Sequence, residues 1–79
     1  MDELTTTDYF CNDVLVKRPY IKLEWCKAAL SHPVRREVQA DGRIRHWLFV
    51  AELNKFLRVV TLEDGITVHN AFPDRRFKP

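Results

Sequence analysis

Residues 34–51 read VRREVQADGRIRHWLFVA, and they decide the fold. The second half of this stretch is rich in β-branched and aromatic side chains, a composition typical of β-strands. Asp41-Gly42 stands in the middle, and this dipeptide is favoured in two-residue type I′ turns. The stretch therefore predicts a β-hairpin with strands over 34–40 and 43–51.

The strand-like pattern continues after the hairpin. Residues 51–55 are polar enough for a longer hairpin loop, and strands are predicted over 56–62 and 66–72, with a turn at Asp64-Gly65 between them. The glycine of this turn is free to take the positive φ of a bulge. Residues 34–72 are thus expected to form an antiparallel β-meander.

Two short helices are predicted before the meander. The first begins after Thr7 or Asp8, either of which is a suitable N-cap, and it ends before Pro19. The second covers about residues 22–31, and His32-Pro33 stops it. The apolar residues at helical spacing are Tyr9, Phe10, Val14 and Leu15 in the first helix and Trp25, Cys26, Ala29 and Leu30 in the second.

The fold class that follows is α+β in a single domain, residues 1–79. Its parts are a helical layer over about 8–32, a three- or four-stranded antiparallel sheet over about 34–72, and a basic C-terminal tail over 73–79. A chain of 79 residues has room for one core and buries only about 60% of the surface that its unfolded form exposes.

Composition and termini predict a cytoplasmic protein without a membrane partner. No stretch approaches the ~20 apolar residues of a membrane span. Residues 1–7 are acidic and polar, where a signal peptide would begin with a basic region. Cys11 and Cys26 are expected to be reduced and buried as small hydrophobes. A zinc site that also used His32 would lack a fourth ligand, so neither a metal nor a cofactor is predicted.

Arginine is concentrated in the second half of the chain. Residues 1–33 hold four Lys/Arg and five Asp/Glu, whereas residues 34–79 hold nine and six, so the two parts carry net charges of −1 and +3. This asymmetry permits an anionic partner such as RNA.

The turns also predict which side chains share a face of the sheet. If Ala40 pairs with Arg43 and Leu62 with Ile66, the expected cross-strand pairs are Val38–Arg45, Arg36–Trp47, Glu37–His46, Val60–Val68, Arg58–Asn70 and Val59–His69. The register across the middle loop stays open. Arg58 and His69 then lie on opposite faces, of which one takes the helices and the other suits a ligand or a partner.

Several short motifs carry a family resemblance over residues 8–77. They are the helix junction at Arg18-Pro19, the acidic-glycine hairpin, Leu57-Arg58-Val59-Val60, Val68-His69-Asn70-Ala71-Phe72 and Asp74-Arg75-Arg76-Phe77. In this layout the chain resembles small BrnT-like bacterial proteins, which are similar to the RelE/ParE toxin superfamily. The resemblance implies a helical layer on an antiparallel sheet.

The resemblance also implies candidate functions. RelE-like proteins are metal-independent endoribonucleases that act on mRNA at the ribosome and are neutralised by an antitoxin, whereas ParE relatives inhibit gyrase and many BrnT-like proteins have no assigned activity. The chain is therefore expected to be a toxin or a toxin-derived RNA-interacting protein, with endoribonuclease activity as one outcome. The alternative is a non-catalytic module that binds a protein partner or forms a homodimer.

Metal-free RNA cleavage needs a base, an acid and cations that stabilise the charge developing on the phosphate. The candidate catalytic residues are His69, His46 and Arg58, and the candidate phosphate-binding residues are Arg45, Arg75 and Arg76.

Each candidate also has a purely structural interpretation. For His46 we favour a hydrogen bond to Glu37, whereas both roles stay open for His69. Arg58 lies in an apolar strand, which is costly unless its charge is paired, so an ion pair or a bond to Asn70 would explain it. The tail arginines would simply be solvated. Trp47 could stack a base, but a core position is the better interpretation.

Overall fold

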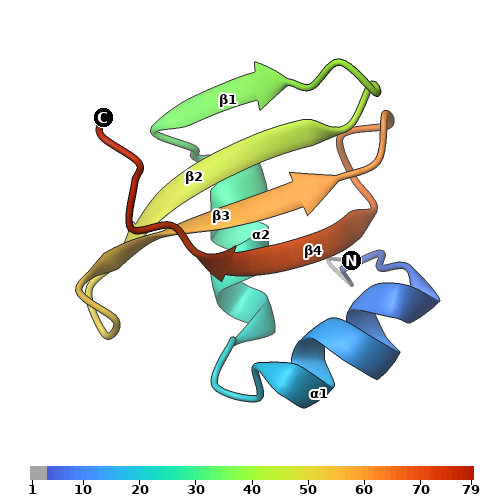
Figure 1. The fold of residues 1–79 in the computed structure, drawn as a ribbon, viewed down its shortest axis with the longest axis horizontal. Coiled ribbons are helices and arrows are strands. Elements are labelled where there is room, and N and C mark those ends of the chain that lie inside the picture. Colours follow the sequence, from blue (N-terminus) through green and yellow to red (C-terminus); the bar gives the residue numbers. More distant parts are fainter. Residues whose placement is uncertain (1–3) are drawn as a thin grey trace.

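The computed structural model describes residues 4–79, which form two helical segments and a four-stranded sheet (Figure 1). In chain order the elements are the π-helical turn η1 (Phe10–Val14), α1 (Leu15–Lys17), α2 (Leu23–Ser31), β1 (Arg35–Val38), β2 (Ile44–Val50), β3 (Lys55–Thr61) and β4 (Val68–Pro73). The strand order is β1-β2-β3-β4, and each neighbouring pair is antiparallel. The predicted α+β class and antiparallel sheet are therefore confirmed.

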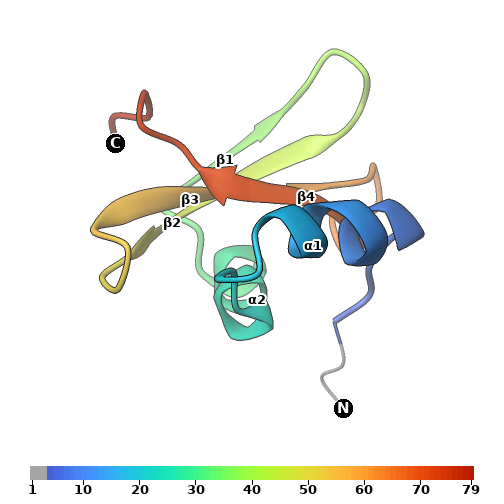
Figure 2. The same cartoon turned by 60° about the horizontal axis from the view of Figure 1, so that its bottom comes forward.

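Both helical segments lie on one side of the sheet, and the C-terminal segment lies on the other (Figure 2). η1 and α1 form one continuous stretch. Thr7 Oγ1 accepts a hydrogen bond from the backbone N–H of Phe10 at 3.1 Å, which is the N-cap contact expected of Thr7. Within residues 4–79, no helix is long and apolar enough to cross a membrane.

The core fills the space between the helices and the sheet. Phe10, Cys26 and Leu57 are completely buried there. Side chains alternate along a strand, so this core side is the helix face and the other side is the open face. The open face carries Arg35, Glu37, Arg45, Trp47, Phe49, Phe56, Arg58, Val60, Asn70 and Phe72.

The register of the first hairpin differs from the prediction by one residue. Arg35 rather than Arg36 lies opposite Trp47, and Arg36 rather than Glu37 lies opposite His46. Because a one-residue change of register moves every side chain of a strand to the other face, Arg36 belongs to the helix face and Glu37 to the open face.

The loop of this hairpin explains the difference. The backbone N–H of Gln39 donates to the carbonyl of Arg43 at 2.7 Å, so the loop has three residues instead of two. Within the loop only Gly42 has a positive φ, 92°, whereas a type I′ turn needs positive φ at both central positions. The carboxylate of Asp41 accepts the N–H of Arg43 at 3.0 Å and stabilises the longer loop.

The predicted register of the second hairpin is also wrong. Arg58 lies opposite Phe72 rather than Asn70, and Val59 no longer faces His69. The pairing shifts between Val60 and Thr61, where β4 contains one extra residue, His69.

Asp64 organises the loop of the second hairpin. Its Oδ1 accepts the backbone N–H groups of Ile66 and Thr67, both at 2.9 Å, and its Oδ2 accepts the Thr67 hydroxyl at 2.6 Å. These side-chain bonds hold residues 66 and 67 in the loop, so β4 begins only at Val68.

The two edges of the sheet are different. At the β4 edge, Thr6 forms a parallel bridge with Val68, whose carbonyl accepts the N–H of Thr7 at 3.0 Å and whose N–H donates to Thr5 at 2.8 Å. All four residues of β1, at the other edge, are exposed. The segment before η1 therefore pairs with β4, whereas β1 is the open edge.

Candidate functional site

A row of four side chains crosses the open face, one from each strand. The register places Arg35 opposite Trp47, Trp47 opposite Arg58, and Arg58 opposite Phe72. Arginine thus alternates with an aromatic residue across the sheet, roughly perpendicular to the strands. These four residues are called the cross-strand row below.

Cation–π contacts connect three of the four members of the row. The guanidinium carbon of Arg58 lies 5.6 Å from the ring centroid of Trp47 and 4.9 Å from that of Phe72. Arg18, which follows α1, lies 5.8 Å from the Phe72 centroid. At these distances the electron-rich faces of the rings attract the cations. The contacts explain how an arginine is accommodated among apolar side chains.

Asp74 fixes the centre of the row. Its Oδ2 accepts hydrogen bonds from Trp47 Nε1 at 2.9 Å and from Arg58 Nε and Nη2 at 3.1 and 2.9 Å, and its Oδ1 accepts the N–H of Arg76 at 3.1 Å. Burial raises the pKa of Asp74, but the hydrogen bonds from Trp47 and Arg58 outweigh it, and the pKa lies below its ordinary value. The ionised carboxylate orients both side chains.

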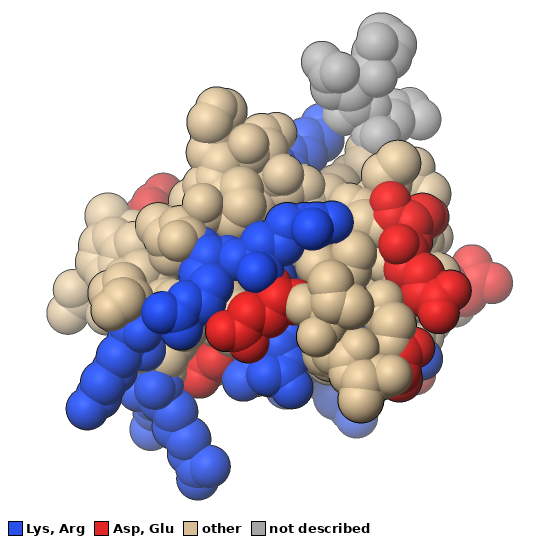
Figure 3. Space-filling view, turned by 90° about the horizontal axis from the view of Figure 1, so that it is seen from above, with Lys and Arg blue, Asp and Glu red and all other residues tan. Residues whose placement is uncertain are grey.

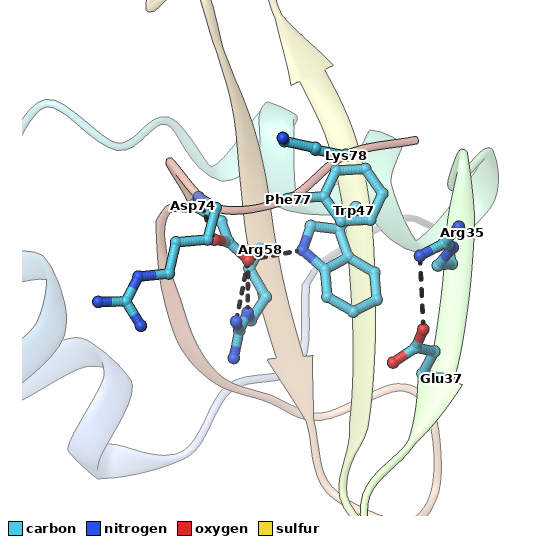
Figure 4. Close-up of a pocket in the computed structure, with 8 residues that line it drawn as sticks. Arg35, Glu37, Trp47, Arg58, Asp74, Phe77 and Lys78 are labelled. Carbon is cyan, nitrogen blue, oxygen red and sulfur yellow. Dashed lines mark hydrogen bonds and ion pairs between the residues drawn. The ribbon is translucent and has the colours of Figure 1, made fainter.

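The row borders an open pocket of about 360 Å³ (Figure 4). Its lining residues are Arg35, Glu37, Trp47, Arg58, Asp74, Arg76, Phe77 and Lys78. These include four cations and two carboxylates, so the pocket has an excess of positive charge. Seen from the β1 side, lysine and arginine side chains form a band across the molecule with acidic side chains among them (Figure 3).

The structure brings only some of the predicted arginines together. Arg58 and Arg76 line the same pocket, whereas Arg75 lines a different one. Arg45 is on the open face, but its Nε donates to Gln39 Oε1 at 2.9 Å. Arg58 and Arg76 are therefore the predicted residues that can act on one ligand.

His46 lies on the helix face and is only 2% exposed. Its Nε2 is 3.1 Å from Thr61 Oγ1, and its buried Nδ1 has no hydrogen-bond partner within residues 4–79. Burial lowers the pKa of His46 to about 4, and the charge of Arg36 adds to the effect. The predicted bond to Glu37 does not form, because Glu37 is on the open face. His46 is a neutral core residue on the opposite face of the sheet from Arg58.

His69 also faces the helical layer. Its Nδ1 is 3.1 Å from Thr7 Oγ1, and the ring of Tyr9 stacks on it with a centroid distance of 4.9 Å. Burial lowers its pKa, and the charge of Arg43 contributes. Neither histidine therefore shares a site with Arg58, although all three were candidates for one catalytic set.

Sequence reasoning missed Arg35, Asp74 and Phe77 as parts of the site. Arg35 was missed because the predicted register was displaced by one residue. Asp74 and Phe77 lie beyond the last strand, in the tail that was interpreted as solvated. One signal was present in the sequence: an arginine inside an apolar strand needs a counter-ion, and Asp74 directly follows the neighbouring strand.

The thiols are not part of the site. Both cysteines are free; Cys26 is buried, and burial raises its pKa to about 12. The prediction that Cys11 is buried is wrong, because it lies on the exposed side of η1. Within residues 4–79 no cluster of His, Cys, Asp or Glu side chains could hold a metal ion.

No protein-family model, curated protein or solved structure matches this chain. The similarity to BrnT-like proteins and to the RelE/ParE superfamily therefore stays a prediction from the sequence.

Proposed function

We propose that the protein binds single-stranded RNA across the open face, as a RelE/BrnT-like toxin or a toxin-derived RNA-interacting protein. The observation that supports this function is the cross-strand row, in which arginines alternate with aromatic rings at the border of a positively charged pocket. Single-stranded nucleic acids are bound by this combination, because cations follow the phosphates and rings stack on the bases.

The arginines of the row suit phosphate recognition. The planar guanidinium can donate two parallel hydrogen bonds to one phosphate. The side chain of Arg35 is 46% exposed and that of Arg58 is 24% exposed, so both retain contact with solvent. Asp74 holds Arg58 in place, which reduces the conformational entropy lost on binding.

RNA binding has more support than RNA cleavage. Cleavage on the open face would need an acid and a base beside the phosphate, and both candidate histidines lie on the helix side. Of the two carboxylates in the pocket, Asp74 is bonded to Arg58 and Trp47, and Glu37 lies 3.7 Å from Arg35.

Fluorescence anisotropy with a labelled oligo(U) of about 12 nucleotides tests the binding proposal. We expect Arg35→Glu to weaken binding at least about tenfold and to make its salt dependence shallower, because a phosphate contact is lost. Lys27→Glu is the matched control, since it makes the same charge change on the exposed side of α2 and should alter affinity less than about twofold. Equal effects of the two substitutions would refute RNA binding at this face.

The toxin proposal has a separate test. Induced expression of the wild type in a bacterial host should slow growth, and Arg35→Glu and Arg58→Ala should relieve the effect if the open face acts on RNA. His69→Ala shows whether the helix-side histidine contributes. If the wild type neither slows growth nor degrades RNA, the protein is not a toxin of this kind.

The open β1 edge favours a second candidate, a module that binds an antitoxin or a second copy by strand addition. In an antiparallel pair, alternate residues direct their backbone groups away from the partner strand, and here these are Arg36 and Val38. Val38 is 65% exposed. Light scattering that detects a dimer, lost in a Val38→Pro variant, would support this module without requiring RNA.

A further inference from the structure

Phe77 occupies a flat slot above the cross-strand row. Its ring stacks on Trp47 with a centroid distance of 4.6 Å and an interplanar angle of 15°. The guanidinium carbon of Arg35 lies 5.2 Å from the Phe77 centroid, and Phe56 meets the ring edge-on at 5.0 Å. Figure 4 shows the ring of Phe77 beside the indole, at the border of the pocket.

The attachment of Phe77 depends on ring contacts rather than on backbone bonds. The C-terminal segment is anchored at Asp74, whose N–H donates to the Phe56 carbonyl at 2.8 Å. Beyond that anchor, the N–H of Phe77 donates to the Asp74 carbonyl over 3.5 Å, which is long and therefore a weak hydrogen bond. Within residues 4–79, residues 77–79 make no other hydrogen bond or ion pair. The ring can therefore leave while Asp74 stays in place.

We propose that this slot is a nucleobase site, in which a base of the bound strand replaces Phe77 between Trp47 and Arg35. The site extends the proposed RNA binding and depends on it. With Phe77 in place Trp47 is only 3% exposed, so a base can stack on the indole only when the phenyl ring moves away. A base offers the same flat π-face as the phenyl ring, and Arg35 can cover its other side.

The sugar–phosphate chain of such a base has cations beside it. Arg58 lies on the row next to Trp47, and Arg76 and Lys78 line the same pocket. Phe77 thus competes with RNA for one position. Only molecules with an open slot can bind a base, so the apparent affinity equals the affinity of the open form multiplied by the fraction of molecules that are open.

Anisotropy measurements on Phe77→Ala test the site. We expect this variant to bind an oligo(U) of about 12 nucleotides about fivefold more tightly than the wild type, because the competitor is gone. An abasic strand of the same length should show less than about a twofold gain, because it has no base to stack. Arg75→Ala is the matched control, because Arg75 belongs to the same segment but lines a different pocket, and it should not strengthen binding.

Trp47→Leu in the Phe77→Ala protein should abolish the gain. A Trp25→Phe background leaves Trp47 as the single indole, and its emission should move to longer wavelength in Phe77→Ala and return on adding oligo(U). An unfolded variant would show the same shift, but its emission would not return on adding oligo(U), so the return distinguishes an open slot from unfolding.

The outcomes separate the slot from RNA binding in general. If Phe77→Ala binds no better than the wild type while Arg35→Glu still loses binding, the base site is wrong and RNA binding stands. An equal gain for the abasic strand would likewise overturn the base site. If neither the wild type nor Phe77→Ala binds RNA, both inferences fail. Binding by Phe77→Ala alone would support the slot.

Discussion

The helix face buries a polar side chain in mid-strand and the open face partly buries one, but the two faces accommodate it in different ways. On the helix face, His46 is neutral, bonded through one nitrogen to Thr61. On the open face, the guanidinium of Arg58 contacts the carboxylate of Asp74 and two aromatic rings. A buried charge is tolerated only where compensating groups are supplied. The open face supplies them, which is why it is the candidate site.

The largest expected difference between the faces is in packing. Phe10→Ala removes a completely buried ring under the helix face and should lower the free energy of unfolding by about 4 kcal/mol. Phe49→Ala, at a residue 46% exposed on the open face, should cost about 1 kcal/mol. Urea denaturation measures both, and equal losses would show that the open face has a core of its own.

The next largest effect is the loss of folding stability at low pH that His46 causes on the helix face. The pKa of His46 is about 4 in the folded protein against 6.5 unfolded, so the unfolded state binds the proton first as the pH falls. Stability is full above pH 6.5 and should fall by up to about 3 kcal/mol as the pH approaches 4.

His46→Leu should flatten this dependence in chemical unfolding at several pH values. His69→Asn is the control for the other histidine with a lowered pKa. An unchanged slope in His46→Leu would mean that His46 is not buried in its neutral form.

Loss of the Asp74–Arg58 ion pair on the open face should lower the free energy of unfolding by a smaller amount, and its pH dependence should fall in a more acidic range. Asp74→Ala leaves Arg58 and Trp47 without their acceptor and should cost about 2 kcal/mol at neutral pH, discounted because Arg58 retains some solvent. The folded pKa of Asp74 is depressed, so this stability is present above the unfolded pKa and disappears as the pH falls through the folded one.

Asp13→Ala, at an exposed residue of η1, is the matched control in the same denaturation series and should change stability by less than about 0.5 kcal/mol. A comparable loss in the two variants would show that the contacts of Asp74 contribute nothing to stability.

Thiol reactivity ranks last, because labelling reports the exposure of each cysteine and involves no change in stability. Cys11 is exposed and should react with a thiol reagent in the native protein, whereas Cys26 should react only after unfolding, since burial raises its pKa to about 12 and excludes the reagent. Two fast-reacting thiols under native conditions would indicate that α2 separates readily from the sheet.

The elements could be predicted from the sequence because their signals are local. Helical spacing and strand alternation placed the helices and the strands, and the positive φ of Gly65, 69°, follows from its place in a turn. The pairing register depends on particular hydrogen bonds within loops. Asp41 and Asp64 make longer loops than the Asp-Gly dipeptides suggest. The first loop reverses the facing of β1, whereas in the second hairpin the loop and the bulge together shift the pairing by two residues, so Asn70 stays on the face of Arg58.

The site was harder to predict because its contacts are distant in sequence. Trp47 and Asp74 are separated by 27 residues and meet only when the chain turns back over the sheet after Pro73. The position of Arg58 in an apolar strand indicates that its charge needs a partner, but the sequence does not identify Asp74 as that partner. Phe77 lies on the row only because Asp74 fixes the start of its segment.

The short pairing of Thr6 with Val68 has a consequence for assembly. A sheet with two free edges can add further copies at both and grow without limit. Here the segment before η1 blocks part of the β4 edge, so among the described residues β1 is the edge left for another strand. Two copies joined β1 to β1 about a two-fold axis would expose two β4 edges, each partly blocked at Val68. Strand addition beyond such a dimer would therefore be hindered at one end of each β4 edge.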